Sequence, residues 1–265
     1  LAAQLVKHGY ATHYYYGGDA DFTNMRSFLI NQRFMNLTEA HDFPVEDRLS
    51  KWGVPDHLLF QRVEKDLSAS HSMRPTFRVI QTSSSHEPFD VPFHRLSDKK
   101  LNAFAYSDDC IGRFVEWLKK TDRWNRSLVV LIPDHLGAWP DDIDNFSFWR
   151  FHVPMLWTGG ALSSTKKVVD IYGSQQDITA SLLGQLGYDH SMFPFSKDLL
   201  DPKEPHYAFF MMNDGFGLID DHGSMIYDYN RKAAVKSKGS SSLFEQRGKA
   251  ITQVLFDYIA RLRNS

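Results

Sequence analysis

The stretch KHGYATHYYYGGDADFTNM, residues 7–25, sets a short run of β-branched and aromatic residues directly before two glycines. The run Ala11–Tyr16 has the composition and length of a strand. The residues that precede it are the apolar half of a helix, so a helix leads directly into the strand. Helices joined to strands in this way are the repeating unit of an α/β sheet.

The same alternation continues along the chain. Further strand-like runs lie at 77–82, 128–132 and 153–157, and helical periodicity marks 98–120, 173–186 and 243–262. Strands that alternate with helices predict an α/β fold with a mostly parallel central sheet flanked by helices on both faces.

Two helix beginnings carry capping signals. Ser97 precedes the helical pattern 98–120 and is its expected N-cap. Asp21 stands where an N-cap would sit for a helix after the two glycines, with Met25, Phe28 and Leu29 as its buried stripe.

The alternation ends near residue 207. The segment YAFFMMNDGFGLIDDHGSMIYDY, residues 207–229, reads as short strands joined at Asp214-Gly215 and His222-Gly223, which predicts a small antiparallel sheet. The stretch VKSKGSSSL, residues 235–243, reads as a polar loop. We therefore expect an α/β domain over 1–200, and antiparallel strands with a C-terminal helix of the same domain over 201–265.

Composition excludes several classes of function. Lysine plus arginine is 30 and aspartate plus glutamate is 32, so a net charge of -2 gives no general attraction to nucleic acid or to an anionic membrane. Cys110 is the only cysteine, which excludes an internal disulfide framework and a cysteine-rich zinc site. No apolar run approaches the roughly 18–20 residues that span a bilayer.

Ligands of open α/β sheets gather beyond the carboxyl ends of the strands, so the residues after each strand are the candidates. Asp134 and His135 follow the run 128–132 in PDHLG, and a carboxylate beside a neutral imidazole suits Zn, Mn or Fe. The alternative is that Asp134 caps a turn and His135 lies on the surface. His86, in TSSSHEPF after the run 77–82, can donate to a phosphate or sulfate oxygen or protonate a leaving group; alternatively it is a solvated loop histidine.

Arg26 would lie in the first turns of the helix after the glycines, where an anion is favoured and a guanidinium can grip phosphate. The alternative is an exposed helical arginine. The serines before His86 lack the Gly-x-Ser-x-Gly setting of a serine hydrolase, and no Gly-x-Gly-x-x-Gly dinucleotide fingerprint occurs. His152 leads into the run 153–157, and we expect it to be a core histidine.

Five motifs in this order resemble the sulfatase branch of the alkaline phosphatase superfamily. They are KHGYATHYYYGGDADFTNM, TSSSHEPF, PDHLG, HVPMLW and SQQDITASLLGQLGY. Within that branch they are similar to the membrane-anchored lipoteichoic acid synthase and phosphoglycerol transferase group, over about residues 1–200. The resemblance implies an alkaline phosphatase-like fold.

The resemblance also implies chemistry. A Thr or Ser nucleophile attacks a phosphodiester, forms a covalent intermediate and passes a phosphoglycerol or phosphoethanolamine head group to an acceptor or to water. Asp134 and His135 match the family's metal ligands, with one divalent ion, Mn or Zn and preferably Mn. His86 matches a substrate-binding histidine. Arg26 is the nearest match to the family's head-group arginine, although the aromatic-Asn-Arg triplet of the family reads TNM here.

In this family the nucleophile and an acidic metal ligand precede the Ala11–Tyr16 strand, so we expect both upstream of Leu1. Transmembrane segments would also lie there, with the catalytic domain on the extracytoplasmic (periplasmic) side of a bacterial inner or cell membrane and a phospholipid head group or anionic glycan as substrate. Two other functions stay open: a sulfuric ester hydrolase, and a non-catalytic domain that binds an anionic glycan or lipid head group.

The 265 residues alone are expected to bind the catalytic metal poorly and to be inactive, because two protein ligands remain where three or four are needed. Calorimetric titration with Mn²⁺ or Zn²⁺, combined with a phosphodiesterase assay, tests this. Tight stoichiometric binding together with turnover would contradict it.

Overall fold

The computed structural model describes residues 1–137, 139–164 and 168–263, so Ala138, the residue after PDHLG in the sequence, lies outside the described residues. The chain separates into two compact units. The first unit comprises Leu1–Leu131, Gly137–Trp139 and Leu156–Ser163, and the second comprises Ile132–Leu136, Pro140–Met155 and Ser164–Ser265.

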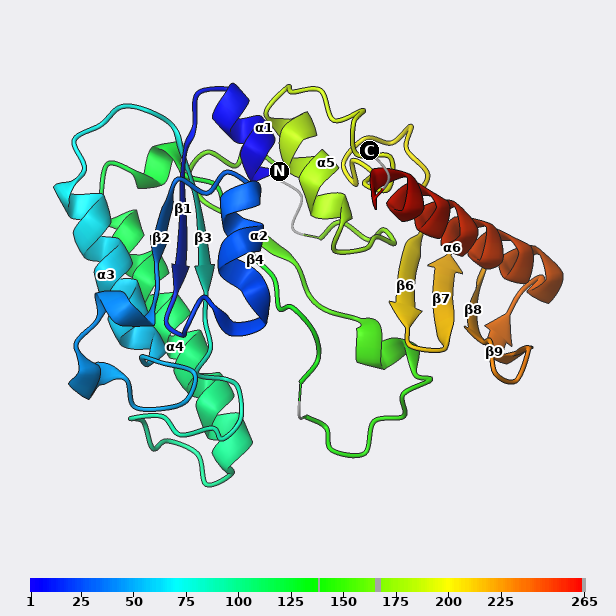
Figure 1. Cartoon of the computed structure of the whole chain (residues 1–265), viewed down its shortest axis with the longest axis horizontal. Coiled ribbons are helices and arrows are strands. Elements are labelled where there is room, and N and C mark those ends of the chain that lie inside the picture. Colours follow the sequence, from blue (N-terminus) through cyan, green and yellow to red (C-terminus); the bar gives the residue numbers. More distant parts are fainter. Residues whose placement is uncertain (138, 165–167, 264–265) are drawn as a thin grey trace. The chain divides into compact units, whose positions relative to one another are not determined.

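The first unit is built on a parallel sheet of three strands in the order β2-β1-β3, as the alternation predicts. The strands are β1 (Ala11–Tyr16), β2 (Asn36–Thr38) and β3 (Thr76–Gln81), and the helices are α1 (Ala2–Lys7), α2 (Met25–Asn31), α3 (Asp56–Ala69) and α4 (Lys99–Lys119). Figure 1 shows the sheet between α3 and α4 on one side and α2 on the other. Helices therefore cover both faces, as predicted.

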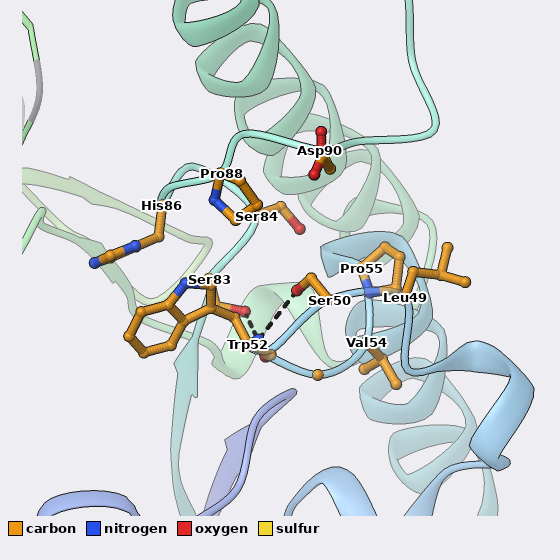
Figure 2. Close-up of a pocket in the computed structure, with 11 residues that line it drawn as sticks. Leu49, Ser50, Trp52, Val54, Pro55, Ser83, Ser84, His86, Pro88 and Asp90 are labelled. Atoms are coloured by element: carbon orange, nitrogen blue, oxygen red, sulfur yellow. Dashed lines mark hydrogen bonds between the residues drawn. The ribbon is translucent and has the colours of Figure 1, made fainter.

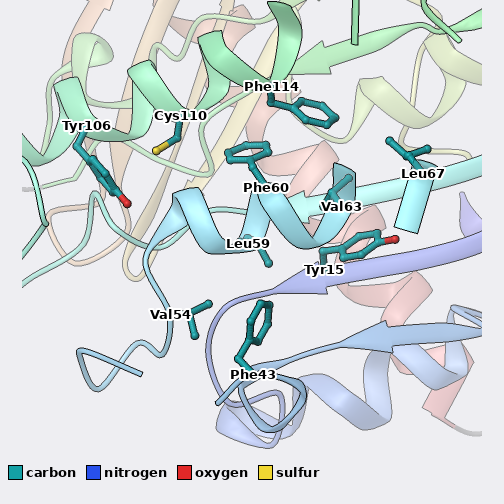
Figure 3. Close-up of a cluster of buried hydrophobic side chains, with 10 residues drawn as sticks. All are labelled: Tyr15, Phe43, Val54, Leu59, Phe60, Val63, Leu67, Tyr106, Cys110 and Phe114. Carbon is teal, nitrogen blue, oxygen red and sulfur yellow. The ribbon is translucent and has the colours of Figure 1, made fainter. Parts of the chain in front are cut away.

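The core of the first unit lies between the sheet and the α3–α4 pair. Tyr15 of β1 is fully buried there, and the rings of Phe60 and Phe114 stack at 5.1 Å between the two helices (Figure 3). Tyr14 points to the opposite face, where its ring meets the edge of Phe34 at 5.2 Å. Alternation along β1 thus supplies apolar contacts to both layers.

Two further strands, β4 (Val129–Leu131) and β5 (Leu156–Thr158), form a separate antiparallel pair. Between them the described residues contain the 3-10 turn Phe148–Phe151 and no α-helix, whereas parallel neighbours need a long crossover, usually a helix. The predicted strand 153–157 begins too early. Pro154 has no N–H for a ladder, so the strand starts after it.

Helix beginnings differ from the capping predictions. Asp98, and not Ser97, caps α4, because its Oδ1 accepts a hydrogen bond from the Leu101 N–H at 2.8 Å. Asp21 precedes the 3-10 turn Phe22–Asn24 and does not cap it; its carboxylate binds Arg26 instead. In the predicted stripe of α2, Leu29 is buried, Met25 is partly buried and Phe28 is exposed.

The second unit contains an antiparallel meander in the order β6-β7-β8-β9, which confirms the predicted C-terminal sheet. Its elements are α5 (Asp177–Gln185), β6 (Ala208–Met212), β7 (Gly215–Asp220), β8 (Gly223–Asp228), β9 (Ala233–Lys238) and α6 (Ser241–Arg263). Phe244 of α6 is buried with Phe216 of β7. Gly248 allows this approach, because a Cβ atom there would overlap the Phe216 ring.

Two predictions for the second unit were wrong. The stretch predicted to be a polar loop contains most of β9, which is an edge strand; its polar residues are compatible with pairing because one edge and much of its surface meet solvent. His152 is exposed and not in the core, because it follows the 3-10 turn and lies outside β5. None of the helices in the described ranges is long and apolar enough to cross a membrane.

His13 of β1 should make the folded state sensitive to acid. Desolvation by burial lowers the pKa of His13 to about 4; Asp66 raises it and Arg78 lowers it. Its Nε2 lies 2.8 Å from the Thr38 hydroxyl. In the unfolded chain a histidine titrates near about 6.5, so the unfolded state binds the proton first as the pH falls. Stability is therefore expected to fall between pH ~6.5 and ~4.

Urea unfolding of the wild type and His13→Gln at about pH 7 and about pH 5 tests this expectation. The variant should lose less stability on acidification than the wild type, whereas the exposed His71→Gln control should follow the wild type. Equal losses in wild type and His13→Gln would contradict the assignment.

Candidate functional site

The loops after β1, β2 and β3 leave the same edge of the sheet, because the three strands are parallel. They carry Asp19, then Glu39 and His41, then His86. This edge is where open α/β sheets bind ligands, and it is where the sequence placed His86 and Arg26.

His86 is exposed at the rim of a pocket whose other lining residues include Trp52, Ser83 and Ser84 (Figure 2). Its ring centroid lies 4.2 Å from that of Trp52. Nδ1 lies 3.1 Å from the carbonyl oxygen of Glu87. A carbonyl only accepts, so this bond needs a proton on Nδ1, and a protonated ring can then donate from Nε2 to an anion.

Asp56 fixes the backbone that leads to His86. Its carboxylate is fully buried and accepts hydrogen bonds from the amides of Ser83 and Ser84 at 3.0 and 3.1 Å, and from the Ser107 hydroxyl at 2.7 Å. Its own amide donates to the Ser84 hydroxyl. Sequence reasoning missed Asp56. A signal was present, since Pro55-Asp56 is a common way to open a helix.

Arg26 is held by two carboxylates. Its Nε lies 2.6 Å from Asp21 Oδ1, and Nη2 lies 3.4 Å from Glu39 Oε1. The hydrogen bond from Arg26 lowers the pKa of Asp21 and in turn raises that of the guanidinium. A phosphate at Arg26 would therefore share the guanidinium with these carboxylates or displace them, and the head-group role of Arg26 stays a prediction.

Aromatic rings connect the Arg26 segment with the His86 pocket. Phe22, in the turn before α2, meets the indole of Trp52 edge-on at 5.6 Å, and the His86 ring lies against the same indole. The first unit therefore brings its two predicted substrate-binding segments into one connected surface.

A cluster that sequence reasoning missed lies at the same strand ends. Asp19, Glu39 and His41 each offer a ligand atom, and these atoms lie within 4.8 Å of one another. Glu39 is buried, and His41 Nδ1 lies 2.9 Å from its Oε1. Carboxylate and imidazole ligands can hold a divalent cation, although Arg26 already balances part of the charge on Glu39. The cluster escaped prediction because the three-residue β2 gave no recognisable strand pattern.

Asp134 and His135 lie in the second unit, on the segment that follows β4, and both side chains are exposed. Asp134 Oδ1 accepts from the His135 amide at 2.8 Å, and Asp134 Oδ2 lies 3.5 Å from His135 Nε2. Two ligands of one ion, each at about 2.0–2.2 Å, lie roughly 3 Å or slightly more apart, so the pair fits two adjacent coordination positions. The assignment of the pair as metal ligands stays a prediction.

Comparisons with known proteins bear on the family and the fold of the chain. The family model described as Sulfatase matches residues 1–188. Phosphoglycerol transferase I of Xanthomonas campestris is 27% identical over 225 residues, which are 78% of this chain and 32% of that protein. The chain thus spans about a third of the length of this curated relative.

Two solved structures share the fold. A protein in the alkaline phosphatase superfamily from Vibrio parahaemolyticus has a TM-score of 0.83 at 25% identity, covering 99% of this chain and 68% of that one. The lipoteichoic acid synthase LtaP of Listeria monocytogenes has a TM-score of 0.79 at 20% identity, covering 99% and 72%. The α/β fold is therefore alkaline phosphatase-like, and the chain belongs to the sulfatase family.

Proposed function

We propose that this chain is part of a metal-dependent enzyme that acts on phosphodiester head groups, as a phosphoglycerol or phosphoethanolamine transferase. The observation that carries the proposal is the Asp134–His135 pair, whose ligand atoms are 3.5 Å apart and open to further ligands. The name of the Xanthomonas relative, phosphoglycerol transferase I, supports the choice of substrate.

Asp134 and His135 would supply two ligands of one divalent ion, with Mn favoured over Zn. When bound, such an ion neutralises charge on the phosphoryl oxygens and lowers the pKa of the attacking hydroxyl. The pair must be in the carboxylate and neutral imidazole forms to do this, and exposure of both side chains leaves room for substrate and for ligands from elsewhere.

His86 would bind the anionic substrate. With Nδ1 donating to the Glu87 carbonyl, Nε2 can donate to a phosphoryl oxygen when the ring is in its imidazolium form, in which both nitrogens carry a proton. Asp56 holds the preceding backbone, so this donor is preorganised for its anion. Arg26 would add a second cation for the head group.

The nucleophile, a Thr or Ser, and a further acidic ligand would lie upstream of Leu1. Membrane contact would come from transmembrane segments in that part of the protein, with the catalytic domain on the extracytoplasmic side of a bacterial membrane. The match to a family model described as Sulfatase favours one second candidate, sulfuric ester hydrolysis, in which the same donors would bind a sulfate.

Replacement of His135 by alanine in the intact protein is expected to lower phosphodiesterase activity on glycerophospho- and phosphoethanolamine lipids by about 100-fold or more. Loss of a group that only hydrogen-bonds to a metal ligand typically lowers metal affinity or activity by about 10–100-fold, and a direct ligand contributes at least as much. The exposed His222→Ala is the matched control in the same unit. Unchanged activity in His135→Ala would exclude the pair from the mechanism, and turnover of aryl sulfates but not of these lipids would favour the sulfatase alternative.

Replacement of His86 by alanine should lower kcat/KM for the same lipids by about 10–100-fold, because a hydrogen bond to a charged group contributes about 1.5–3 kcal/mol. The Mn²⁺ content of the purified protein should stay at the wild-type level, since His86 is assigned to substrate and not to metal. Metal analysis and steady-state kinetics of the variant test this role of His86. An unchanged kcat/KM, or loss of the metal, would contradict its assignment to substrate binding.

A further inference from the structure

We propose that Gln175 is a positioning residue for the Asp134–His135 pair and sets its affinity for metal. The inference rests on the proposed function, because it takes the pair as metal ligands. Gln175 acts through the backbone that carries the pair, because its side chain donates to two backbone carbonyls there.

One side-chain amide makes both contacts. Gln175 Nε2 donates to the carbonyl oxygen of Pro133 at 2.7 Å and to that of Asp134 at 2.8 Å. A carboxamide nitrogen carries two protons, so one group can satisfy both acceptors. The amide nitrogen, and not the amide oxygen, faces the two carbonyls, because a carbonyl oxygen can only accept a hydrogen bond.

The two carbonyls belong to the peptide planes on either side of the Asp134 Cα atom. Holding both planes restricts φ and ψ of Asp134 together, and these angles set the direction of its side chain and of the chain into His135. Two other hydrogen bonds of the pair run to neighbours in the chain, from the His135 amide to Asp134 Oδ1 and between His135 Nδ1 and the Leu136 carbonyl. Gln175 therefore supplies a restraint from a distant part of the sequence.

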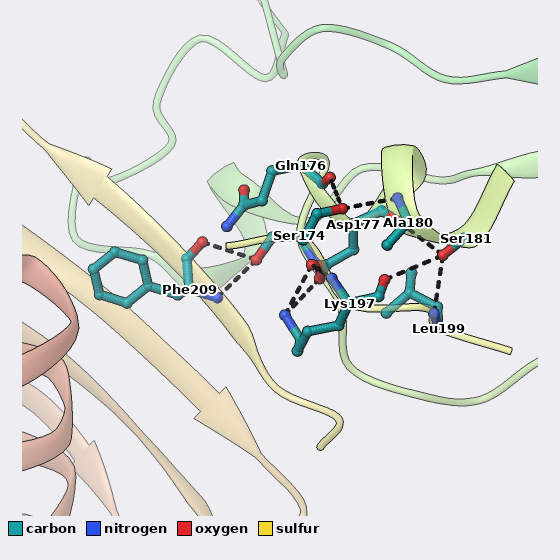
Figure 4. A network of polar contacts seen from close by, with 9 residues as sticks. Ser174, Gln176, Asp177, Ala180, Ser181, Lys197, Leu199 and Phe209 are labelled. Carbon is teal, nitrogen blue, oxygen red and sulfur yellow. Dashed lines mark hydrogen bonds and ion pairs between the residues drawn. The ribbon is translucent and has the colours of Figure 1, made fainter. Parts of the chain in front are cut away.

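Gln175 is itself well anchored. Ser174 Oγ donates to the Phe209 carbonyl at 2.9 Å and accepts from the Phe209 amide at 2.8 Å, which ties the segment to β6 (Figure 4). The Ser174 amide donates to Asp177 Oδ2 at 2.8 Å, and the fully buried Asp177 is paired with the Lys197 ammonium at 2.8 Å. The backbone on both sides of Gln175 is thus fixed before its side chain reaches the loop.

A restraint of this kind acts on metal affinity more than on the rate of the loaded enzyme. Without it, the exposed Asp134–His135 segment samples more conformations, and the ion must restrict them when it binds. Once bound, the ion holds the two ligands itself. Groups that hold metal ligands by hydrogen bonds typically change metal affinity by about 10–100-fold, and we expect this range here.

The test compares Gln175→Glu and Gln175→Ala with the matched control Gln176→Ala in the intact protein. Gln175→Glu keeps the shape but replaces the donor by an oxygen that faces two carbonyls, while the exposed Gln176 makes neither of these two bonds. The measurements are the Kd of the metal-free protein for Mn²⁺, the Mn²⁺ concentration for half-maximal activity, kcat at saturating Mn²⁺, and the Tm of the metal-free protein.

Both Gln175 variants should bind Mn²⁺ about 10–100-fold more weakly and need correspondingly more Mn²⁺ for half-maximal activity. At saturating Mn²⁺ their kcat should return to within about twofold of the wild type, and Gln176→Ala should behave as the wild type. A merely structural role would instead lower Tm and leave a loss of activity that added Mn²⁺ does not rescue, which would overturn the proposal.

His135→Ala separates this inference from the proposed function. Wild-type Mn²⁺ affinity in Gln175→Glu with weakened affinity in His135→Ala would overturn the role of Gln175 and leave the metal pair in place. Wild-type affinity in both variants would overturn the metal assignment of the pair itself.

Discussion

The arrangement of the first unit depends on the hydrogen bonds that the buried carboxylate of Asp56 accepts. It begins α3, accepts from the backbone after β3 and from Ser107 of α4, and so joins two helices to the end of the sheet. A buried charge is tolerated when it is fully hydrogen-bonded, and the amides that satisfy it are those leading to His86. The interaction that stabilises the layer also orients the candidate substrate-binding loop.

The second unit also holds a loop by hydrogen bonds from one side chain to two backbone groups, but there the side chain is the donor. Asp56 stands at the first position of a helix and accepts from two amides, whereas Gln175 stands just before a helix and donates to two carbonyls. In both cases a side chain at a helix beginning restrains a loop that follows a strand. Each loop then presents exposed groups, His86 or the Asp134–His135 pair, whose directions depend on these backbone contacts.

Local patterns made much of the fold predictable. β1 has the predicted bounds, and α4 is one residue shorter at each end than the predicted range, because strong periodicity and a buried face coincide there. The predictions that were wrong concern segments whose structure depends on contacts with distant parts of the chain. β9 is polar and pairs only because β8 lies beside it, and Asp21 binds Arg26 although its position suits a cap. Glu39 and His41 escaped notice because β2 is too short to show a period.

The candidate site shows the same limit. His86 and the Asp134–His135 pair could be found because each follows a predictable strand, but the residues that hold them come from distant segments, 27 and 41 positions away along the chain. Such pairs have no local signature. The same holds for Asp19, Glu39 and His41, which only the parallel register of β1 and β2 brings together.

The described part of the chain therefore offers two groups of possible metal ligands, and we assign the ion to Asp134 and His135. The most direct test is a crystal structure of the intact protein with Mn²⁺, phased on the anomalous signal of the metal. We predict an anomalous peak about 2.0–2.2 Å from the Asp134 carboxylate and the His135 imidazole. A peak between Asp19, Glu39 and His41, with none at Asp134 and His135, would contradict it.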